Sequence, residues 1–222
     1  QEIDFFQYTI NNHTSLDQLK AYTNSLDIDG IIAIEIYDKD ILKSVLSLDI
    51  PIAFIDAYFN LKRYSGNFDT IMMSSYEQIH QITTNCIKKG LTRIAFCGDY
   101  KHCKGFYERF LGLRDALTDY NLHFDLTTSI IHPDSSPYGE ASWLITEINK
   151  MKQKPNVFIC ANDSIAISLI KALKQLNIKV PEPIQVVGFD NIMDASFITP
   201  SLTTVNVDKE LLGQEAIHIL VD

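Results

Sequence analysis

Short apolar runs alternate with longer amphipathic stretches along this chain of 222 residues. The runs are rich in β-branched and aromatic residues and are apolar on both faces, which is typical of strands that helices cover on both sides. We predict strands at residues 3–6, 30–34, 51–55, 71–73, 94–97, 157–161, 186–189 and 204–207.

The stretches between these runs carry apolar residues at helical spacing. The clearest apolar stripe consists of Ala166, Leu169, Ile170, Leu173 and Leu176. We predict helices at residues 16–26, 41–48, 76–89, 107–120, 141–151, 164–176 and 210–220. Because strand and helix alternate, the sequence predicts an α/β fold with parallel sheets.

Composition narrows the class of protein. A chain of this length forms one domain or two small lobes, and a hydrophobic content of 46% is enough for a sizeable core. The 28 acidic residues outnumber the 19 lysines and arginines, so the net charge is -9. Since DNA binding displaces counterions from phosphates and needs a basic face, we do not expect this chain by itself to bind DNA.

Cysteine usage and hydropathy bear on the compartment. The four cysteines, Cys86, Cys97, Cys103 and Cys160, form no C-x-x-C pair. A reduced, cytoplasmic protein is the simplest interpretation. There is no signal peptide and no long apolar span, so we expect neither secretion nor a membrane segment.

Polar side chains follow three of the predicted strands. Asp56 follows the run at 51–55, Asn162 and Asp163 follow the run at 157–161, and Asp190 follows the run at 186–189. Ligands of open parallel sheets bind at the carboxyl ends of the strands. Arg109, near the start of a predicted helix, adds a rigid fork of donors. Such groups bridge vicinal hydroxyls, so the set suits a polyol.

Each of these residues also has an ordinary structural role. An Asp or Asn between strand and helix is often an N-cap, and for Asp163 taken alone that is the favoured interpretation. For Asp56 a plain turn or cap is as common as ligand contact. Arg109 alone is more often a solvated helix residue. The convergence of these residues on one sheet edge is what favours a ligand site.

Enzymatic chemistry has little support in the sequence. There is no nucleophile elbow, zinc-protease motif or phosphate-binding loop. The spacing of Cys97, His102 and Cys103 fits no common zinc pattern. The histidines are scattered along the chain at His13, His80, His102, His123, His132 and His218. We therefore expect no enzyme activity, no metal ion and no cofactor.

The order and spacing of several segments resemble the effector-sensing domain of the lactose/galactose repressor (LacI/GalR) family of bacterial transcription factors. The similar segments are residues 29–32, 50–56, 89–96, the R-x-x-G-x-x-x-A-L helix at 109–117, Ala161-Asn162-Asp163, residues 186–190 and residues 202–205. The sequence departs from the family at Ser74-Ser75, where Asp-Asn is usual, at Leu91, which replaces a common His, and at Ser201, which replaces a common Pro.

The resemblance implies a two-lobed fold of the periplasmic-binding-protein-like type I class, in which each lobe is a mainly parallel sheet flanked by helices. The N-terminal lobe would be residues 1–73 plus 208–222 and incomplete, and the C-terminal lobe residues 74–207. By the same resemblance, Asp56, Arg109, Asn162 and Asp190 line an effector pocket between the lobes, and Asp163 is a structural partner at the helix start.

These implications lead to a functional hypothesis. We expect the effector-sensing and dimerisation core of a sugar-responsive, LacI-type repressor, with helices 76–89 and 210–220 as candidates for the homodimer contact. Operator DNA would be bound only through a helix-turn-helix headpiece, which this chain lacks. The alternative is an extracytoplasmic sugar-binding receptor of a transport system. The sequence leaves open which sugar binds, whether a nucleobase or sugar phosphate replaces it, and whether the effector induces or co-represses.

Overall fold

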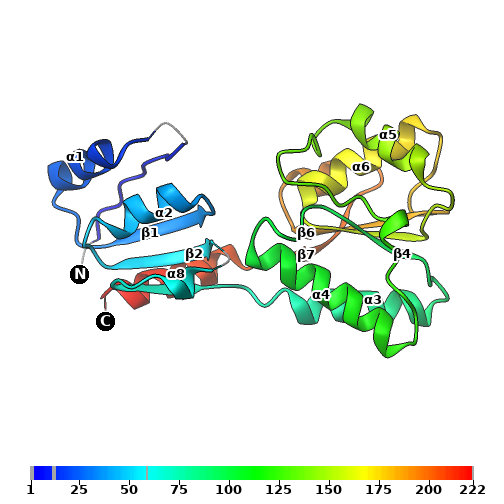
Figure 1. Cartoon of the computed structure of the whole chain (residues 1–222), viewed down its shortest axis with the longest axis horizontal. Helices are drawn as coiled ribbons and strands as arrows, with labels where there is room; N and C mark the ends of the chain where they lie inside the picture. The colour runs from blue at the N-terminus through cyan, green and yellow to red at the C-terminus, as the bar shows by residue number, and fades with distance from the viewer. Residues whose placement is uncertain (1–2, 12–13, 59, 222) are drawn as a thin grey trace. The chain divides into compact units, whose positions relative to one another are not determined.

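The computed structural model describes residues 3–11, 14–58 and 60–221, and the chain divides into two compact units (Figure 1). Unit 1 comprises Gln1–Ile71 and Glu210–Asp222, and unit 2 comprises Met72–Lys209. The chain therefore passes from one unit to the other twice, near residue 71 and near residue 209. The sequence predicted that the chain passes between the lobes after residue 73 and again before residue 208.

Unit 1 is built on a three-stranded parallel sheet. Strands β1 (Ile31–Ile36), β2 (Ile52–Ala57) and β3 (Phe68–Ile71) pair in the order β1-β2-β3. Helices α1 (Leu16–Leu26) and α2 (Lys39–Leu46) bury Leu19, Leu42 and Val45 against one face of the sheet, around Phe54. Helix α8 (Lys209–Val221) packs on the other face through Ala216.

Side chains fix where α1 and α2 of unit 1 begin. Ser15 and Gln18 form a capping box at the start of α1, in which the Ser15 hydroxyl accepts from the Gln18 amide and the Gln18 side chain accepts from the Ser15 amide. The Asp38 carboxylate accepts from two backbone amides at the start of α2. These caps satisfy donors that a helix leaves without intrahelical partners.

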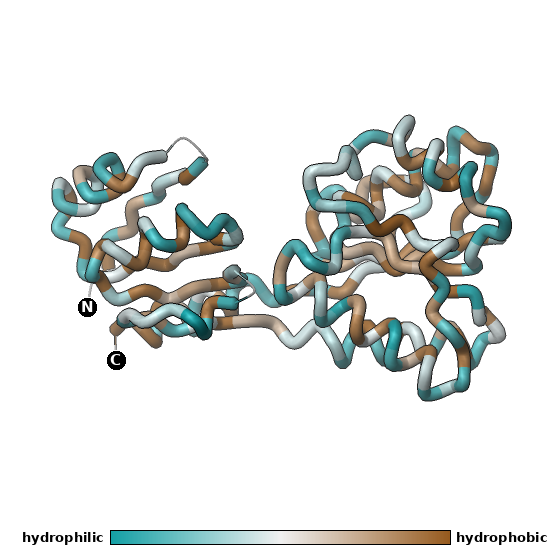
Figure 2. The backbone as a smooth tube through the Cα atoms, viewed as in Figure 1, coloured by the Kyte–Doolittle hydropathy of each residue, from teal (hydrophilic) through white to brown (hydrophobic). Residues whose placement is uncertain are grey.

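Unit 2 contains a four-stranded parallel sheet. Strands β4 (Ile94–Cys97), β5 (Val157–Cys160), β6 (Gln185–Asp190) and β7 (Thr203–Asn206) pair in sequence order. Every residue of β4 and β5 is buried, because helices cover both faces. Figure 2 shows hydrophobic residues concentrated along the strands and hydrophilic ones along the outer helices and loops.

Two pairs of helices enclose this sheet. Helices α3 (Tyr76–Lys88) and α4 (Lys104–Asp119) lie on one side, and α5 (Ala141–Lys150) and α6 (Asp163–Gln175) on the other (Figure 1). Helices α3 and α4 approach closely at Gly112, where an added Cβ would lie 2.4 Å from the carbonyl oxygen of Tyr76. A short helix, α7 (Asp194–Phe197), follows β6, and a 3-10 turn, η2 (Leu126–Thr128), also lies in unit 2. Unit 1 contains the 3-10 turn η1 (Leu61–Arg63).

The predicted α/β fold with parallel sheets and flanking helices is confirmed, and three details of the prediction are wrong. Residues 3–6 form no strand, because no strand among the described residues pairs with them. Phe5 and Phe6 are 67% and 53% exposed. The strand predicted at 71–73 is β3 and ends at Ile71, where the chain leaves unit 1. Helix α4 begins three residues before the predicted start, because Cys103 caps it.

Candidate functional site

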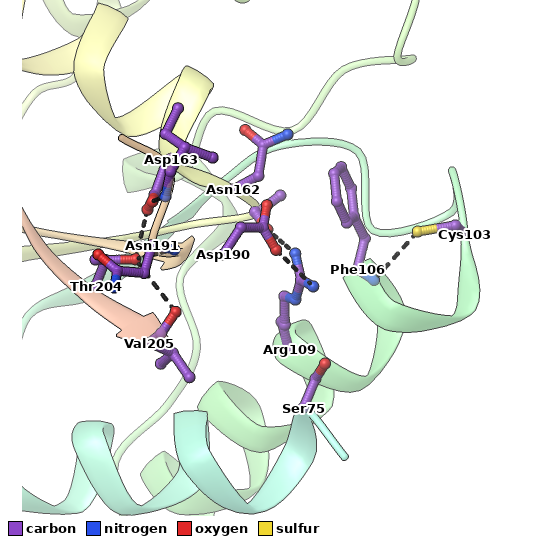
Figure 3. Close-up of polar contacts among 12 residues, drawn as sticks. Ser75, Cys103, Phe106, Arg109, Asn162, Asp163, Asp190, Asn191, Thr204 and Val205 are labelled. Carbon is purple, nitrogen blue, oxygen red and sulfur yellow. Dashed lines mark hydrogen bonds and ion pairs between the residues drawn. The ribbon is translucent and has the colours of Figure 1, made fainter. Parts of the chain in front are cut away.

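The polar residues predicted in unit 2 gather at the carboxyl edge of its sheet. Asp190 is the last residue of β6, and Asn162 lies just beyond the end of β5. The strands are parallel and in register, with Phe158 opposite Val186, so their ends meet at the same edge. Arg109 reaches this edge from α4, and Figure 3 shows its guanidinium pointing toward Asp190.

Arg109 is the most constrained residue of the site. Its side chain is only 7% exposed, and one guanidinium nitrogen lies 3.4 Å from a carboxylate oxygen of Asp190, whose side chain is 32% exposed. The other terminal nitrogen donates to the backbone carbonyl of Ala161, at the end of β5. Arg109 therefore joins α4 to the ends of β5 and β6.

Two aromatic rings hold the guanidinium of Arg109 in place. Its central carbon lies 3.7 Å from the centre of the Phe189 ring and 5.3 Å from the centre of the Phe106 ring. Cation–π contacts of this kind are stronger when the cation is desolvated, as it is here. Neither ring was among the residues predicted for the site. Phe189 directly precedes Asp190, and Phe106 lies one helical turn before Arg109. These two spacings are the features of the sequence that could have indicated rings beside the site.

Asn162 combines a structural role with a position at the site. Its side-chain oxygen accepts a hydrogen bond from the Ile165 amide at 3.0 Å and so forms the N-cap of α6. The cap uses the oxygen, so the amide NH₂ is the part of Asn162 that can donate to a ligand. The N-cap role that is common for an Asp or Asn between strand and helix is therefore the role of Asn162.

The strand ends that carry the predicted carboxylates have left-handed backbone conformations. Asp190 has a φ of 106°, the next residue, Asn191, has a φ of 47°, and Asp56 has a φ of 49°. Such conformations are costly for residues other than glycine and persist only where the surroundings enforce them. At Asp190 the turn directs the chain out of β6 toward α7.

Three of the four predicted residues, Arg109, Asn162 and Asp190, lie together in unit 2. Asp56, the fourth, belongs to unit 1, where it lies in β2, one residue from its carboxyl end, and is half-buried.

Asp163 lies beneath the site rather than in it. Its carboxylate is completely buried, accepts from the Thr204 hydroxyl at 2.6 Å and accepts from the Ile192 amide at 2.9 Å. It is the first residue of α6, and the cap that we favoured for Asp163 is instead provided by Asn162.

The groups considered for metal binding or nucleophilic chemistry have other environments. Within residues 3–11, 14–58 and 60–221, no set of three or more His, Cys, Asp or Glu side chains is arranged to hold a metal ion. His102 pairs with Asp134 at 3.3 Å, and Cys103 caps α4. Burial raises the pKa of the Cys160 thiol well above its ordinary value, so this thiol stays protonated. His13 lies outside the described residues.

The electrostatics of the site are close to neutral. Arg109 and Asp190 are oppositely charged and in contact, and Asn162 is uncharged. The edge therefore presents amide, carboxylate and guanidinium groups that donate and accept hydrogen bonds without a net charge. This arrangement can orient a neutral ligand that is rich in hydroxyl groups.

A family model decides where this chain belongs. The model of the periplasmic binding protein-like domain matches residues 83–222. The chain belongs to this family. The match covers most of unit 2 and all of α8, and it includes Arg109, Asn162 and Asp190.

Individual relatives confirm the predicted resemblance to LacI/GalR regulators. The NTD biosynthesis operon regulator NtdR of Bacillus subtilis (strain 168) is 27% identical over 218 residues, which are 98% of this chain and 64% of the relative. The HTH-type transcriptional regulator GalR of Lacticaseibacillus casei is 28% identical in an alignment of 212 residues, which covers 92% of this chain and 62% of the relative. This chain thus spans less than two thirds of the length of either regulator. Both relatives are transcription regulators and not enzymes.

A solved structure shares the fold. The complex of the transcriptional regulator CelR with cellobiose superposes with a TM-score of 0.79 and 23% sequence identity, over 93% of this chain and 62% of that one. None of the helices formed by the described residues combines the length and apolar character that crossing a bilayer requires.

Proposed function

We propose that this chain is the effector-sensing and dimerisation core of a sugar-responsive, LacI-type transcriptional repressor. The observation that carries the proposal is the buried Arg109, which aromatic rings and Asp190 hold at the carboxyl edge of the unit 2 sheet. A desolvated, preoriented guanidinium beside an amide and a carboxylate is built to make directed hydrogen bonds to a ligand.

The charge balance supports a sugar as effector. An anion such as a sugar phosphate would meet the Asp190 carboxylate as well as Arg109, whereas a neutral polyol can use both groups. CelR, a regulator of the same fold, was solved in complex with cellobiose. That complex supports a saccharide as the effector.

We assign effector contact to Asp56, Arg109, Asn162 and Asp190. For the last three, the assignment is supported by the bonds of Arg109 to Asp190 and to the carbonyl of Ala161, the residue before Asn162. The family resemblance at residues 50–56 supports it for Asp56, which would add a second carboxylate. Neither a metal ion nor a cofactor is part of the proposal, and the protein is not an enzyme.

In the whole protein the domain would act on DNA through a helix-turn-helix headpiece, in the cytoplasm. The acidic net charge of -9 supports DNA contact outside this chain. Such operators are pseudo-palindromic, so two headpieces must be held together, which a two-fold homodimer does most simply. Helices α3 and α8 are the proposed dimer contacts. The relatives that the chain matches are regulators, which favours this function over a transport receptor.

A thermal-shift screen tests the proposal. The chain is heated with each of a panel of neutral sugars that includes D-galactose and cellobiose, and with purines and sugar phosphates as competing classes. A ligand at 100 times its Kd stabilises a protein by about 2.7 kcal/mol, which raises the melting temperature by several degrees. We expect a sugar to do so. Stabilisation by purines alone would contradict the sugar assignment. In Arg109→Ala the sugar should no longer raise the melting temperature. Arg114→Gln, on the same helix but 46% exposed, is the control for general effects of removing an arginine.

A further inference from the structure

The buried carboxylate of Asp163 connects three segments of unit 2. Asp163 begins α6, and its two oxygens accept from the Thr204 hydroxyl on β7 at 2.6 Å and from the Ile192 amide in the β6–α7 loop at 2.9 Å. The residue is 0% exposed. Burying a carboxylate is costly unless hydrogen bonds compensate, and both bonds here involve a charged acceptor.

The strand beside Asp163 is shaped to admit this carboxylate. A Cβ at Gly188 would lie 2.1 Å from a carboxylate oxygen of Asp163 and 2.8 Å from a methyl carbon of Leu202. Any side chain at position 188 would displace the carboxylate or the strand. Gly188 and Thr204 therefore both serve the placement of Asp163, one by leaving room and the other by donating.

The loop that Asp163 holds is the one that carries Asp190. Asp190 and Asn191 have left-handed backbone conformations, and the Ile192 amide that binds Asp163 follows directly. The Thr204 hydroxyl also accepts from the Asn191 amide at 3.3 Å. Figure 3 shows Asn191 and Thr204 beside Asp163. A turn with two unfavourable φ angles needs such external bonds to stay in one conformation.

We propose that Asp163 is a positioning residue of the effector site, which fixes the turn at residues 190–192 and thereby holds the Asp190 carboxylate against Arg109. This inference rests on the proposed function of that site. Asp163 touches neither Arg109 nor the ligand in this account, so it acts through Asp190. Capping of α6 does not explain its burial, because Asn162 supplies the cap.

The first experiment follows amide hydrogen exchange in the protein without ligand. Asp163→Asn keeps the shape of the side chain but loses one acceptor, and Thr204→Val removes the hydroxyl donor. We expect either variant to accelerate exchange at residues 191 and 192 about tenfold or more, while β4 and β5 stay protected. Thr204→Ser should restore protection. Asp194→Asn, which alters an exposed carboxylate in the same region, should change nothing.

Two outcomes of this experiment would overturn the inference. One is unchanged exchange at residues 191 and 192 in both Asp163→Asn and Thr204→Val. The other is an equal rise throughout unit 2, which would make Asp163 a general stabilising residue. Should Asp163→Asn fail to fold, Thr204→Val still tests the inference at residue 192, whose amide is bonded to Asp163 and not to Thr204. This variant leaves the carboxylate in place but removes the hydrogen bonds of the Thr204 hydroxyl with both Asp163 and the Asn191 amide, so exchange at residue 191 alone is not decisive for it.

The second experiment measures binding of D-galactose and cellobiose in a double-mutant cycle of Asp163→Asn with Asp190→Asn. If Asp163 acts through Asp190, the loss of affinity caused by Asp190→Asn is smaller when Asp163 is already replaced. Additive losses would contradict that route. If neither sugar binds the unmodified protein, the proposed function fails while the exchange result still decides the positioning role. If sugar binding is unchanged in Asp163→Asn, only the inference fails.

Discussion

The guanidinium carbon of Arg109 lies 3.7 Å from the centre of the Phe189 ring, and Phe189 is the residue immediately before Asp190. One strand end thus supplies both the surface on which Arg109 stacks and the carboxylate with which it pairs. Because Phe189 is fully buried while Asp190 is partly exposed, the ring fixes Arg109 from below and the carboxylate fixes it at the edge.

Replacing this ring should damage both stability and the site. Phe189→Leu removes the stacking surface and leaves a cavity, so we expect a loss of about 1–3 kcal/mol in the free energy of unfolding. Phe106→Leu should cost less, because its ring centre lies 5.3 Å from the guanidinium carbon. Urea denaturation of both variants measures the difference. Equal losses in the two variants would show that the stacking of Arg109 on Phe189 contributes no more to the free energy of unfolding than its contact with Phe106.

The close contact of α3 and α4 gives a second prediction. An alanine at Gly112 would place its Cβ 2.4 Å from the Tyr76 carbonyl oxygen and 3.1 Å from the His80 amide nitrogen. Since both are backbone atoms, the helices must separate, and we expect Gly112→Ala to cost about 1–3 kcal/mol.

Gly213 in α8 is a matched control, because nothing lies within 4 Å of its added Cβ. Gly213→Ala should therefore stabilise the protein by up to about 1 kcal/mol, through better helix propensity alone. The two variants are compared by urea denaturation. Equal stability of Gly112→Ala and the unmodified protein would mean that the two helices are not packed as described.

A third prediction concerns pH. The Glu147 carboxylate lies 2.6 Å from the Lys150 ammonium and 3.1 Å from a ring nitrogen of His132. Burial alone would raise its pKa, but hydrogen bonds from Lys150 and His132 outweigh burial and lower the pKa below its ordinary value. The charged form therefore stabilises the folded state. That contribution is complete above the ordinary pKa and disappears as the pH falls through the lowered one.

Glu147→Gln should accordingly lower the free energy of unfolding by about 1 kcal/mol at pH 7, and this difference should disappear as the pH falls through the lowered pKa of Glu147. Glu140→Gln, an exposed residue of the same region, should follow the unmodified protein at every pH. Denaturation curves from about pH 7 to about pH 3 measure the difference. A difference for Glu147→Gln that is as large at the acid end of this range as at pH 7 would contradict the sign of the shift.

The sequence was sufficient for features that depend on local pattern. Apolar periodicity predicted the helices and most strands, because burial on both faces leaves a readable run, as in β4 and β5. It failed at residues 3–6, since pairing depends on a neighbouring strand and not on hydrophobicity. It also missed α7, which is only 4 residues long and has little room for a period.

For the site, too, some features could be predicted from the sequence and others could not. Topology predicts that Asn162 and Asp190 lie at one edge, because parallel strands end there. The stacking of Arg109 on Phe189 and the burial of Asp163 against Thr204 depend on distances between side chains 80 and 41 positions apart. No local pattern encodes such distances, so these contacts needed the structure.

Isothermal titration calorimetry of the unmodified chain and of Arg109→Ala, with D-galactose and cellobiose, tests the central claim most directly. We predict that the unmodified chain binds one of these sugars. Losing a charged hydrogen-bond donor costs about 1.5–3 kcal/mol or more, so Arg109→Ala should weaken binding at least about tenfold. Arg114→Gln should bind as tightly as the unmodified chain. Sugar binding that is unchanged in Arg109→Ala, or binding of purines without any sugar, would contradict the account.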